Sequence, residues 1–243
     1  MSVSKYPLIV TRAEPGASET LRRLDQMGHT ALRAPALTLH ERTDIALPET
    51  SAISGLLFTS ANGVRAYAAQ RDDRHIAAWC VGPATAEAAR QDGFSTVHES
   101  SGNAVDLARF IASRSAPTDV PLLHVANAAA AGNLKRDLQS LGFSVQFAPL
   151  YEMRPAKQLS TEVLELIAHQ KSAIILIHSA KGAEAFASMI EGRGLQIAAL
   201  IAISDPASSP LANLAIDCTF IADAPNEDGL LQALERALAT LSA

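Results

Sequence analysis

The sequence predicts an α/β protein made of two similar domains, each with a parallel sheet flanked by helices. Three observations lead to this prediction. Short apolar runs alternate with segments of helical period. The apolar runs are continuous, as in parallel strands that are covered on both faces. The first half of the chain also aligns with the second. With 243 residues, 48% hydrophobic and 19% charged, the chain is long enough for two domains and apolar enough to fold.

The expected elements follow one another from the N-terminus. Residues 8–10 form an apolar run that predicts a strand, and residues 18–27 have the period of a helix, which Gly28 ends. Residues 30–32 return to an extended pattern. Further strands are expected at residues 56–58, 78–81, 122–125, 145–147, 174–177 and 200–203.

An internal repeat relates the two halves of the chain. The offset between matched residues grows from 114 to 119 to 123 along the sequence, as expected when loops take insertions while the elements keep their length. This spacing is too long for a solenoid repeat and indicates a duplicated domain. The matched pairs include Leu8 with Leu122, Ala34-Pro35 with Ala148-Pro149, Ser60-Ala61 with Ser179-Ala180, Pro83-Ala84 with Pro206-Ala207, and Asn103 with Asn226.

Two extended segments are candidate linkers between the domains. Each follows an Ala-Pro dipeptide, at residues 37–39 and 150–153, and proline disfavours helix in the residue before it. Two equivalent crossings permit a discontinuous arrangement, with residues 1–36 and 154–243 in one domain and residues 37–153 in the other. The linker strands would then lie near residues 36–40 and 149–154. Two separate linear halves are the simpler alternative, and the residues alone leave both open.

Composition and motifs exclude several classes of function. The net charge of -5 provides no basic field for nucleic acid or an anionic membrane, and no apolar run is long enough to span a bilayer. Residues 1–7 lack the pattern of a signal peptide, so we expect a cytoplasmic protein. Cys80 and Cys218 lie in apolar runs and are expected to be buried, reduced thiols. The histidines lack metal-ligand spacing and the phosphate-binding glycine motifs are missing, so we expect no metal and no cofactor.

Polar residues at the strand-to-helix turns are the candidate ligand contacts. Such turns present backbone N–H groups at a helix N-terminus, which attract carboxylates. Serine, threonine and asparagine at these places are also common helix caps, so capping alone is the competing interpretation for each. Arg12, at the end of the first strand, could bind a carboxylate through two donors or could be a solvated surface charge. The candidates at the other turns are Ser60, Ala61, Asn62, Gly82, Thr85, Ser179, Ala180 and Lys181.

The order of these motifs resembles that of the uroporphyrinogen-III synthase family, over nearly the whole chain. No single motif is very specific, but the series is. It comprises Ile9-Val10-Thr11-Arg12 with Glu14-Pro15, Ala34-Pro35-Ala36-Leu37, Phe58-Thr59-Ser60-Ala61-Asn62-Gly63-Val64, Val81-Gly82-Pro83-Ala84-Thr85-Ala86, Pro149-Leu150-Tyr151, and Ser179-Ala180-Lys181-Gly182.

The resemblance implies a specific fold and reaction. The family has two α/β domains joined by a two-stranded linker, with a cleft between them. Its members cyclise hydroxymethylbilane to uroporphyrinogen III with inversion of ring D, without metal or organic cofactor. Tyr151 matches the family's linker tyrosine, so we expect it to be catalytic and to donate a proton to the leaving hydroxyl. We expect a monomer, and a transient contact with the enzyme that supplies the substrate is compatible with this expectation.

The sequence departs from the family pattern at three places, and the first two of these motivate a second hypothesis. Ala126-Asn127 stands where the family often has Arg-Gly, Asp205 adds a carboxylate at a turn that would bind an anion, and His178 replaces the threonine of the first copy. The alternative is a divergent, non-catalytic two-domain binding protein for an anionic tetrapyrrole.

Overall fold

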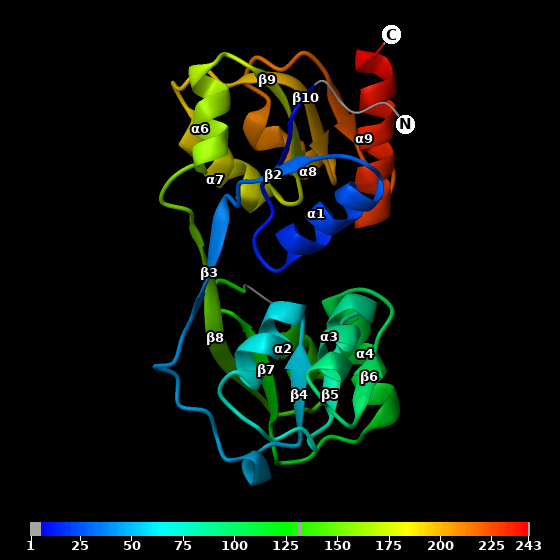
Figure 1. The fold of residues 1–243 in the computed structure, drawn as a ribbon. Coiled ribbons are helices and arrows are strands. Elements are labelled where there is room, and N and C mark those ends of the chain that lie inside the picture. Colours follow the sequence, from blue (N-terminus) through cyan, green and yellow to red (C-terminus); the bar gives the residue numbers. More distant parts are fainter. Residues whose placement is uncertain (1–5, 131–132, 243) are drawn as a thin grey trace. The chain divides into compact units, whose positions relative to one another are not determined.

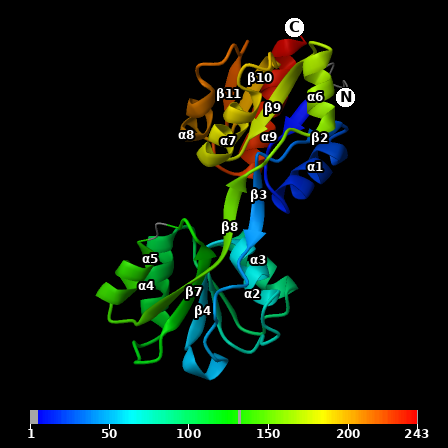
Figure 2. The ribbon, with the colours of Figure 1, turned by 90° about the vertical axis from the view of Figure 1, so that its left-hand side faces the viewer.

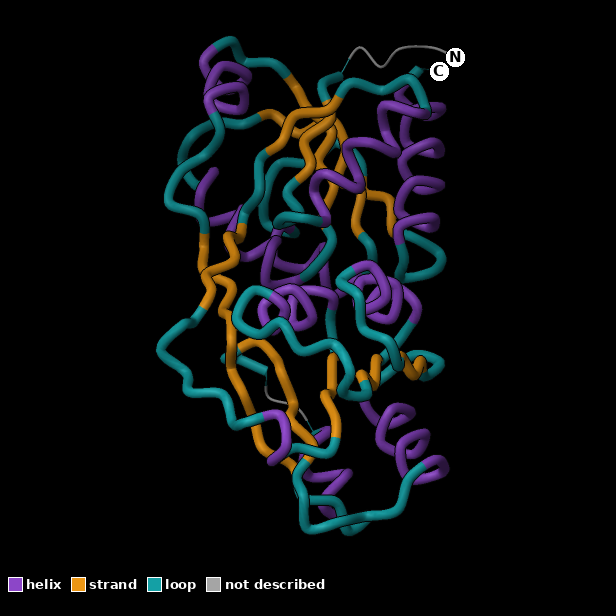
Figure 3. Tube along the Cα trace, turned by 60° about the horizontal axis from the view of Figure 1, so that its bottom comes forward, coloured by secondary structure: helices purple, strands orange, loops and turns teal. Residues whose placement is uncertain are grey.

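Strands and helices alternate along the chain, as the apolar pattern predicts (Figure 3). The computed structural model describes residues 6–130 and 133–242. Outside the described residues lie residues 1–5, which make up most of the segment that was compared with a signal peptide. Ala131, which follows shortly after Ala126-Asn127, also lies outside them.

The first sheet is five-stranded, in the order β11-β10-β9-β1-β2, and its pairings are parallel (Figure 1). Its strands are β1 (Leu8–Val10), β2 (Ala31–Arg33), β9 (Ser172–Ile177), β10 (Gln196–Ala202) and β11 (Thr219–Ile221). The helices around it are α1 (Gly16–Gln26), α6 (Thr161–Ala168), α7 (Ala180–Ile190), α8 (Asp205–Ser208) and α9 (Glu227–Leu241), with a 3₁₀ turn at Ser209–Leu211.

The second sheet is six-stranded, in the order β3-β8-β7-β4-β5-β6, and its pairings from β8 to β6 are parallel. Its strands are β3 (Leu37–Glu41), β4 (Gly55–Phe58), β5 (Ala78–Cys80), β6 (Val97–Glu99), β7 (Leu122–Asn127) and β8 (Val145–Pro155). Its helices are α2 (Ala61–Ala68), α3 (Pro83–Gln91), α4 (Ala104–Arg114) and α5 (Leu134–Ser140), with a 3₁₀ turn at Thr50–Ala52.

The chain divides into two compact units. Unit 1 consists of Met1–Leu39 and Arg154–Ala243, and unit 2 of His40–Met153. The chain passes from one unit to the other twice, in β3 and in β8, which run side by side in opposite directions (Figure 2). Backbone hydrogen bonds from Ala156 to Ala36 and from Arg42 to Leu150 fix this antiparallel pair.

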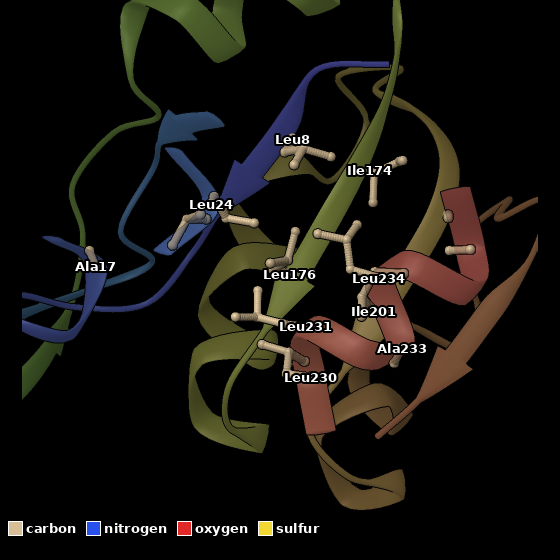
Figure 4. Packing of buried hydrophobic residues seen from close by; sticks show 13 residues of the cluster. Leu8, Ala17, Leu24, Ile174, Leu176, Ile201, Leu230, Leu231, Ala233 and Leu234 are labelled. Atoms are coloured by element: carbon tan, nitrogen blue, oxygen red, sulfur yellow. The ribbon is translucent and has the colours of Figure 1, made fainter. Parts of the chain in front are cut away.

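The core of unit 1 explains why its strands are continuously apolar. Leu8, Ile9 and Val10 are all fully buried, although successive side chains of a strand point to opposite faces. One face packs against α1 and α9, where Leu230 and Leu234 lie over the sheet (Figure 4). Both faces of the central strands are therefore covered by helices, as in other parallel sheets.

The two units share one strand order, which confirms the predicted pair of similar parallel α/β domains. Read from β2, the first sheet runs β2-β1-β9-β10-β11, and the second runs β8-β7-β4-β5-β6. The helix caps also correspond. Ser60 and Ser179 cap α2 and α7, and Asn103 and Asn226 cap α4 and α9, each accepting a hydrogen bond from a backbone N–H of the first turn.

Some local features differ from the predictions or between the two copies of the repeat. Helix α1 begins at Gly16, two residues before the predicted start, because the Glu14 carboxylate accepts the hydrogen bond of the Ser18 backbone N–H. Helix α8 is much shorter than α3, its counterpart, since Pro210 introduces a 3₁₀ turn directly after it. The strand expected at residues 145–147 continues to Pro155.

The cysteines differ from each other. Cys80 is fully buried, and burial raises the pKa of its thiol to about 12, so it is inert at neutral pH. Cys218 is partly exposed, which corrects the expected burial, because it directly precedes β11, the edge strand of its sheet. Both thiols are free.

A buried histidine makes the stability of unit 2 depend on pH. His124 in β7 is 3% exposed, its Nε2 has no hydrogen-bond partner in the part of the chain that the structure describes, and its ring meets Phe147 edge-on at 5.5 Å. Burial penalises the imidazolium and lowers the pKa of His124 to about 4. An unfolded histidine takes up a proton near pH 6.5, so stability is lost as the pH falls from there toward 4.

Replacement His124→Leu is therefore expected to flatten the pH dependence of unit 2 between pH 6.5 and 4. The wild-type loss over this range is about 3 kcal/mol by linkage. Urea unfolding at a series of pH values, followed by the fluorescence of Trp79 in unit 2, measures it. His75→Leu, at an exposed histidine of the same unit, is the control and should leave the pH profile unchanged. A wild-type profile that is flat from pH 7 to 4.5 would contradict this assignment.

Candidate functional site

The candidate residues lie where parallel strands end and helices begin. Arg12 follows β1, Ser60 follows β4 and Ser179 follows β9, so each stands at the carboxyl end of a central strand. Ligands of open α/β sheets bind at this edge.

Tyr151 occupies an irregular point of β8. Along the pairing with β7, Pro149 lies opposite Ala126, but Tyr151 lies opposite Asn127, so Leu150 is an extra residue in β8. The side chain of Tyr151 is 4% exposed, and its hydroxyl lies 2.8 Å from the Ser60 hydroxyl. The bulge therefore brings the linker tyrosine to the turn after β4.

The surroundings of Tyr151 keep its phenol protonated. Burial raises the pKa of Tyr151 above its ordinary value of 10. Hydrogen bonds with Ser60 and with the backbone of Asn127 act in the opposite direction, because they stabilise the phenolate. The phenol is therefore protonated at neutral pH, and two hydrogen bonds would stabilise its anion.

Ser60 both caps a helix and contacts Tyr151. Its Oγ accepts a hydrogen bond from the Gly63 backbone N–H at 3.4 Å, which begins α2. A Cβ at position 63 would lie 2.8 Å from the Val125 carbonyl oxygen, so only glycine allows α2 to approach β7 this closely. The two sequence interpretations of Ser60, a cap and a site residue, are thus compatible.

The other candidates of unit 2 differ in accessibility. Ala61 and Asn62, in the first turn of α2, are partly exposed. Gly82 precedes α3 with an extended backbone and, lacking a side chain, makes no side-chain capping hydrogen bond to the first turn of that helix. Thr85 is 5% exposed, so its hydroxyl is much less accessible than those of the other candidates. The backbone N–H groups at the start of α3 are the better-placed donors there.

Arg12 is the centre of a polar cluster in unit 1. Its Nη1 lies 3.2 Å from Glu227 Oε2, 3.4 Å from the Gly16 carbonyl oxygen and 3.5 Å from the Thr20 hydroxyl. The side chain is 35% exposed, and among the described residues no partner is found for Nε or Nη2. Arg12 is therefore held through one nitrogen, while its other donors stay available to a carboxylate.

Glu227, the first residue of α9, holds this cluster together. Its side chain is 19% exposed; the Thr20 hydroxyl donates to Oε1 at 2.7 Å, and His178 Nε2 lies 3.2 Å from Oε2. Burial alone would raise the pKa of Glu227, but hydrogen bonds from His178 and Thr20, together with the charges of His178 and Arg12, outweigh it and bring the pKa to about 2. Glu227 is therefore ionised at every physiological pH.

The second turn of unit 1 follows β9. Ser179 Oγ accepts a hydrogen bond from the Gly182 backbone N–H at 3.1 Å and caps α7. Ala180 is the first residue of that helix and is partly exposed. Lys181 is exposed and lines a groove on α7 that is described below.

Sequence reasoning missed Glu227 and Thr20, and noted His178 only as a departure from the family pattern. Glu227 is separated from Arg12 by 215 residues. A weak signal existed, since Asn226 matches Asn103 in the repeat and both cap helices, which places Glu227 in the first turn of α9. That signal predicts the position of the carboxylate but not its partners.

Residues 6–130 and 133–242 contain neither a metal-binding cluster nor a membrane-spanning helix. No group of three histidine, cysteine, aspartate or glutamate side chains there is arranged to hold a metal ion. In the same residues, no helix combines the length and the apolar character needed to cross a bilayer.

The fold and the polar groups at its strand ends place this chain among two-unit parallel α/β proteins threaded out and back. A family model described as uroporphyrinogen-III synthase HemD matches residues 18–232. The chain therefore belongs to the uroporphyrinogen-III synthase family, which confirms the resemblance seen in the sequence and connects the protein with tetrapyrrole biosynthesis.

Solved structures show the same fold at low sequence identity. The crystal structure of uroporphyrinogen-III synthetase from Helicobacter pylori 26695 is 16% identical, with a TM-score of 0.66 over 95% of this chain and 99% of that one. A mutant uroporphyrinogen III synthase from the extremely thermophilic bacterium Thermus thermophilus is 13% identical, with a TM-score of 0.52 over 97% and 99% of the two chains. No curated protein sequence matches this chain significantly.

Proposed function

We propose that this protein cyclises hydroxymethylbilane to uroporphyrinogen III with inversion of ring D. The observation that carries the proposal is the pair of hydroxyls, Tyr151 Oη and Ser60 Oγ, 2.8 Å apart at the carboxyl end of β4. Family membership supports the same reaction class. The reaction needs a proton donor at the departing hydroxyl and donors for several carboxylates, and both kinds of group are present.

The proton path in this proposal runs through both hydroxyls. Tyr151 is almost completely buried, whereas Ser60 is partly exposed. Ser60 donates its proton to the leaving hydroxyl, which departs as water, and takes the proton of Tyr151 in return. Ring closure at the substituted carbon later releases one proton, which restores the phenol. The net loss is one water molecule, and no other reactant is consumed.

The remaining candidates bind the carboxylates of the substrate in this proposal. Arg12 offers the donors that Glu227 leaves available. Backbone N–H groups and polar side chains at three helix N-termini, where negative charge is favoured, contribute further donors. They belong to Ser179, Ala180 and Lys181 at α7, to Ser60, Ala61 and Asn62 at α2, and to Gly82 and Thr85 at α3.

Product analysis tests the proposal directly. The purified chain is supplied with hydroxymethylbilane, and the uroporphyrinogen isomers are oxidised and separated by chromatography. We expect the type III isomer to dominate at a rate above the spontaneous closure. Formation of the type I isomer alone, at the spontaneous rate, would overturn the proposal.

One observation favours the non-catalytic alternative. Asp205 is exposed and is the first residue of the four-residue α8, so it places a carboxylate at the strand end where the other copy has Gly82. A protein that binds the tetrapyrrole without turning it over would show saturable binding of uroporphyrinogen and no type III product in the same assay.

A further inference from the structure

Unit 1 contains a groove of about 440 Å³ beside helix α7. One wall is the segment 155–159, which leaves β8, and the other is α7 with the turn after it. The floor is apolar and includes Leu37, Leu159 and Ala185, all of them buried. A groove of this volume is in the range of small-molecule sites.

The rim of the groove is positively charged. Lys157, Lys181 and Arg193 line it and are exposed, and Glu184 is its one acidic lining residue. Among residues 6–130 and 133–242, none of these three cations has a carboxylate within ion-pair distance. The excess is local, because the whole chain has a net charge of -5. Unpaired cations around an apolar floor fit a ligand that is both flat and apolar and anionic at its edge.

The repeat connects this groove with the Tyr151 site of unit 2. The offset of 114 that places Pro35 on Pro149 also places Leu37 on Tyr151, and the offset of 119 places Ser179 on Ser60. The groove therefore lies at the place in unit 1 that corresponds to the proton donor in unit 2. Where unit 2 has a phenol beside the capping serine, unit 1 has a leucine floor and a lysine, which suit binding rather than proton transfer.

We propose that this groove is a pyrrole-binding subsite, in which one pyrrole ring lies on the apolar floor and its carboxylate arms contact Lys157, Lys181 and Arg193. The inference rests on the proposed function for the identity of the ligand. Arginine pairs with a carboxylate through two donors, and the lysines add mobile point charges. Leu37 belongs to β3 and Pro155 to β8, so an occupant also contacts the ends of both crossing strands.

The test uses porphobilinogen, a single pyrrole with two carboxylates, as the probe. Titration of the full chain is followed by NMR chemical shifts or calorimetry, at fixed ionic strength. The double variant Lys157→Ala with Arg193→Ala is expected to weaken binding about tenfold, as for the loss of two partly exposed charge contacts. Arg22→Ala, at an exposed arginine on α1 of the same unit, is the matched control and should bind as the wild type does.

Hydrogen exchange gives a second measurement, because nonspecific attraction of an anion to the lysines and the arginine would not change the exchange rate of the backbone beside the groove. The Ala156 backbone N–H bonds to the Ala36 carbonyl oxygen beside the groove, and we expect the probe to slow exchange in residues 155–159. Equal effects of inorganic phosphate would reduce the groove to a nonspecific anion site and overturn the proposal. Unchanged affinity in the double variant would also overturn it.

The outcomes separate this inference from the proposed function. Type III product without probe binding in the groove would leave the reaction standing and remove the subsite. Probe binding that depends on Lys157 and Arg193, together with type I product only, would keep a pyrrole site and remove the synthase reaction. In an active enzyme, the double variant should raise KM with little change in kcat, because these residues do not contact the leaving hydroxyl.

Discussion

Replacing Tyr151 with phenylalanine is expected to slow formation of uroporphyrinogen III by about 10²-fold, the usual loss when a general acid is removed. The ring still fills the buried space, so folding should be unaffected, while the hydroxyl 2.8 Å from Ser60 is lost. The rate of isomer III formation, measured by chromatography of the products, gives the size of the effect. Type I product should rise in proportion, because unclosed substrate cyclises spontaneously.

Tyr67→Phe is the matched control for this variant. Tyr67 is also a buried tyrosine of unit 2, 2% exposed, but its ring packs against Phe58 and Phe94, and its hydroxyl is hydrogen-bonded with Thr50, which is not a candidate site residue. Its replacement should leave the rate unchanged. If Tyr151→Phe is as fast as Tyr67→Phe, the phenol does not donate the proton.

The relay through Ser60 predicts that the two hydroxyls act as a unit. Ser60→Ala should slow the reaction nearly as much as Tyr151→Phe, and the double variant should be little slower than either single one. Independent, multiplicative effects would show that Ser60 only caps α2. A thermal melt of each variant separates the loss of the cap, about 1 kcal/mol, from the effect on rate.

Replacing Glu227 with glutamine is expected to destabilise unit 1 by about 3 kcal/mol at pH 7, because Arg12 and His178 lose their shared anion. The variant should also lose an acid-dependent component of stability. The pKa of Glu227 is about 2 in the folded chain and near 4.5 when unperturbed, so this stability is complete above pH 4.5 and is lost as the pH falls toward 2. The difference between these two pKa values corresponds to about 3 kcal/mol of folding stability.

Unfolding of unit 1 between pH 7 and 2.5, followed by far-UV circular dichroism, measures both effects. Glu162→Gln is the control, since Glu162 is also a glutamate in the first turn of a unit 1 helix but is exposed. It should leave the acid limb of the stability curve unchanged. An identical acid limb in wild type and Glu227→Gln would contradict the role of this carboxylate.

The features that could be predicted are those that depend on burial on both faces of a strand. The run Ile174–Ile177 is apolar at every position because each side chain is covered, and the sequence pattern alone therefore identifies the strand. The repeat identified equivalent turns, and the serines at positions 60 and 179 do cap equivalent helices. Capping residues that recur at equivalent positions of the two copies can therefore be predicted from the sequence.

Pairings between distant residues could not be predicted in the same way. The contact of Tyr151 with Ser60 depends on a single extra residue in β8, and the contact of Arg12 with Glu227 joins α9 to the end of β1. Neither leaves a periodic trace in the sequence. The short length of α8, in contrast, has a local cause in the sequence, since Pro206 and Pro210 in one short segment restrict a helix.

The threading of the chain has a consequence for the order in which the protein folds. The central strand β1 pairs with β9, so Leu8 finds its partner Ile174 only after 166 further residues have been made. Unit 2 is one continuous stretch, His40–Met153, and all of its strands except β3 and the end of β8 lie within that stretch. During synthesis unit 2 can therefore fold first, while the edge of β1 that pairs with β9 stays unpaired until the C-terminal third of the chain has been made.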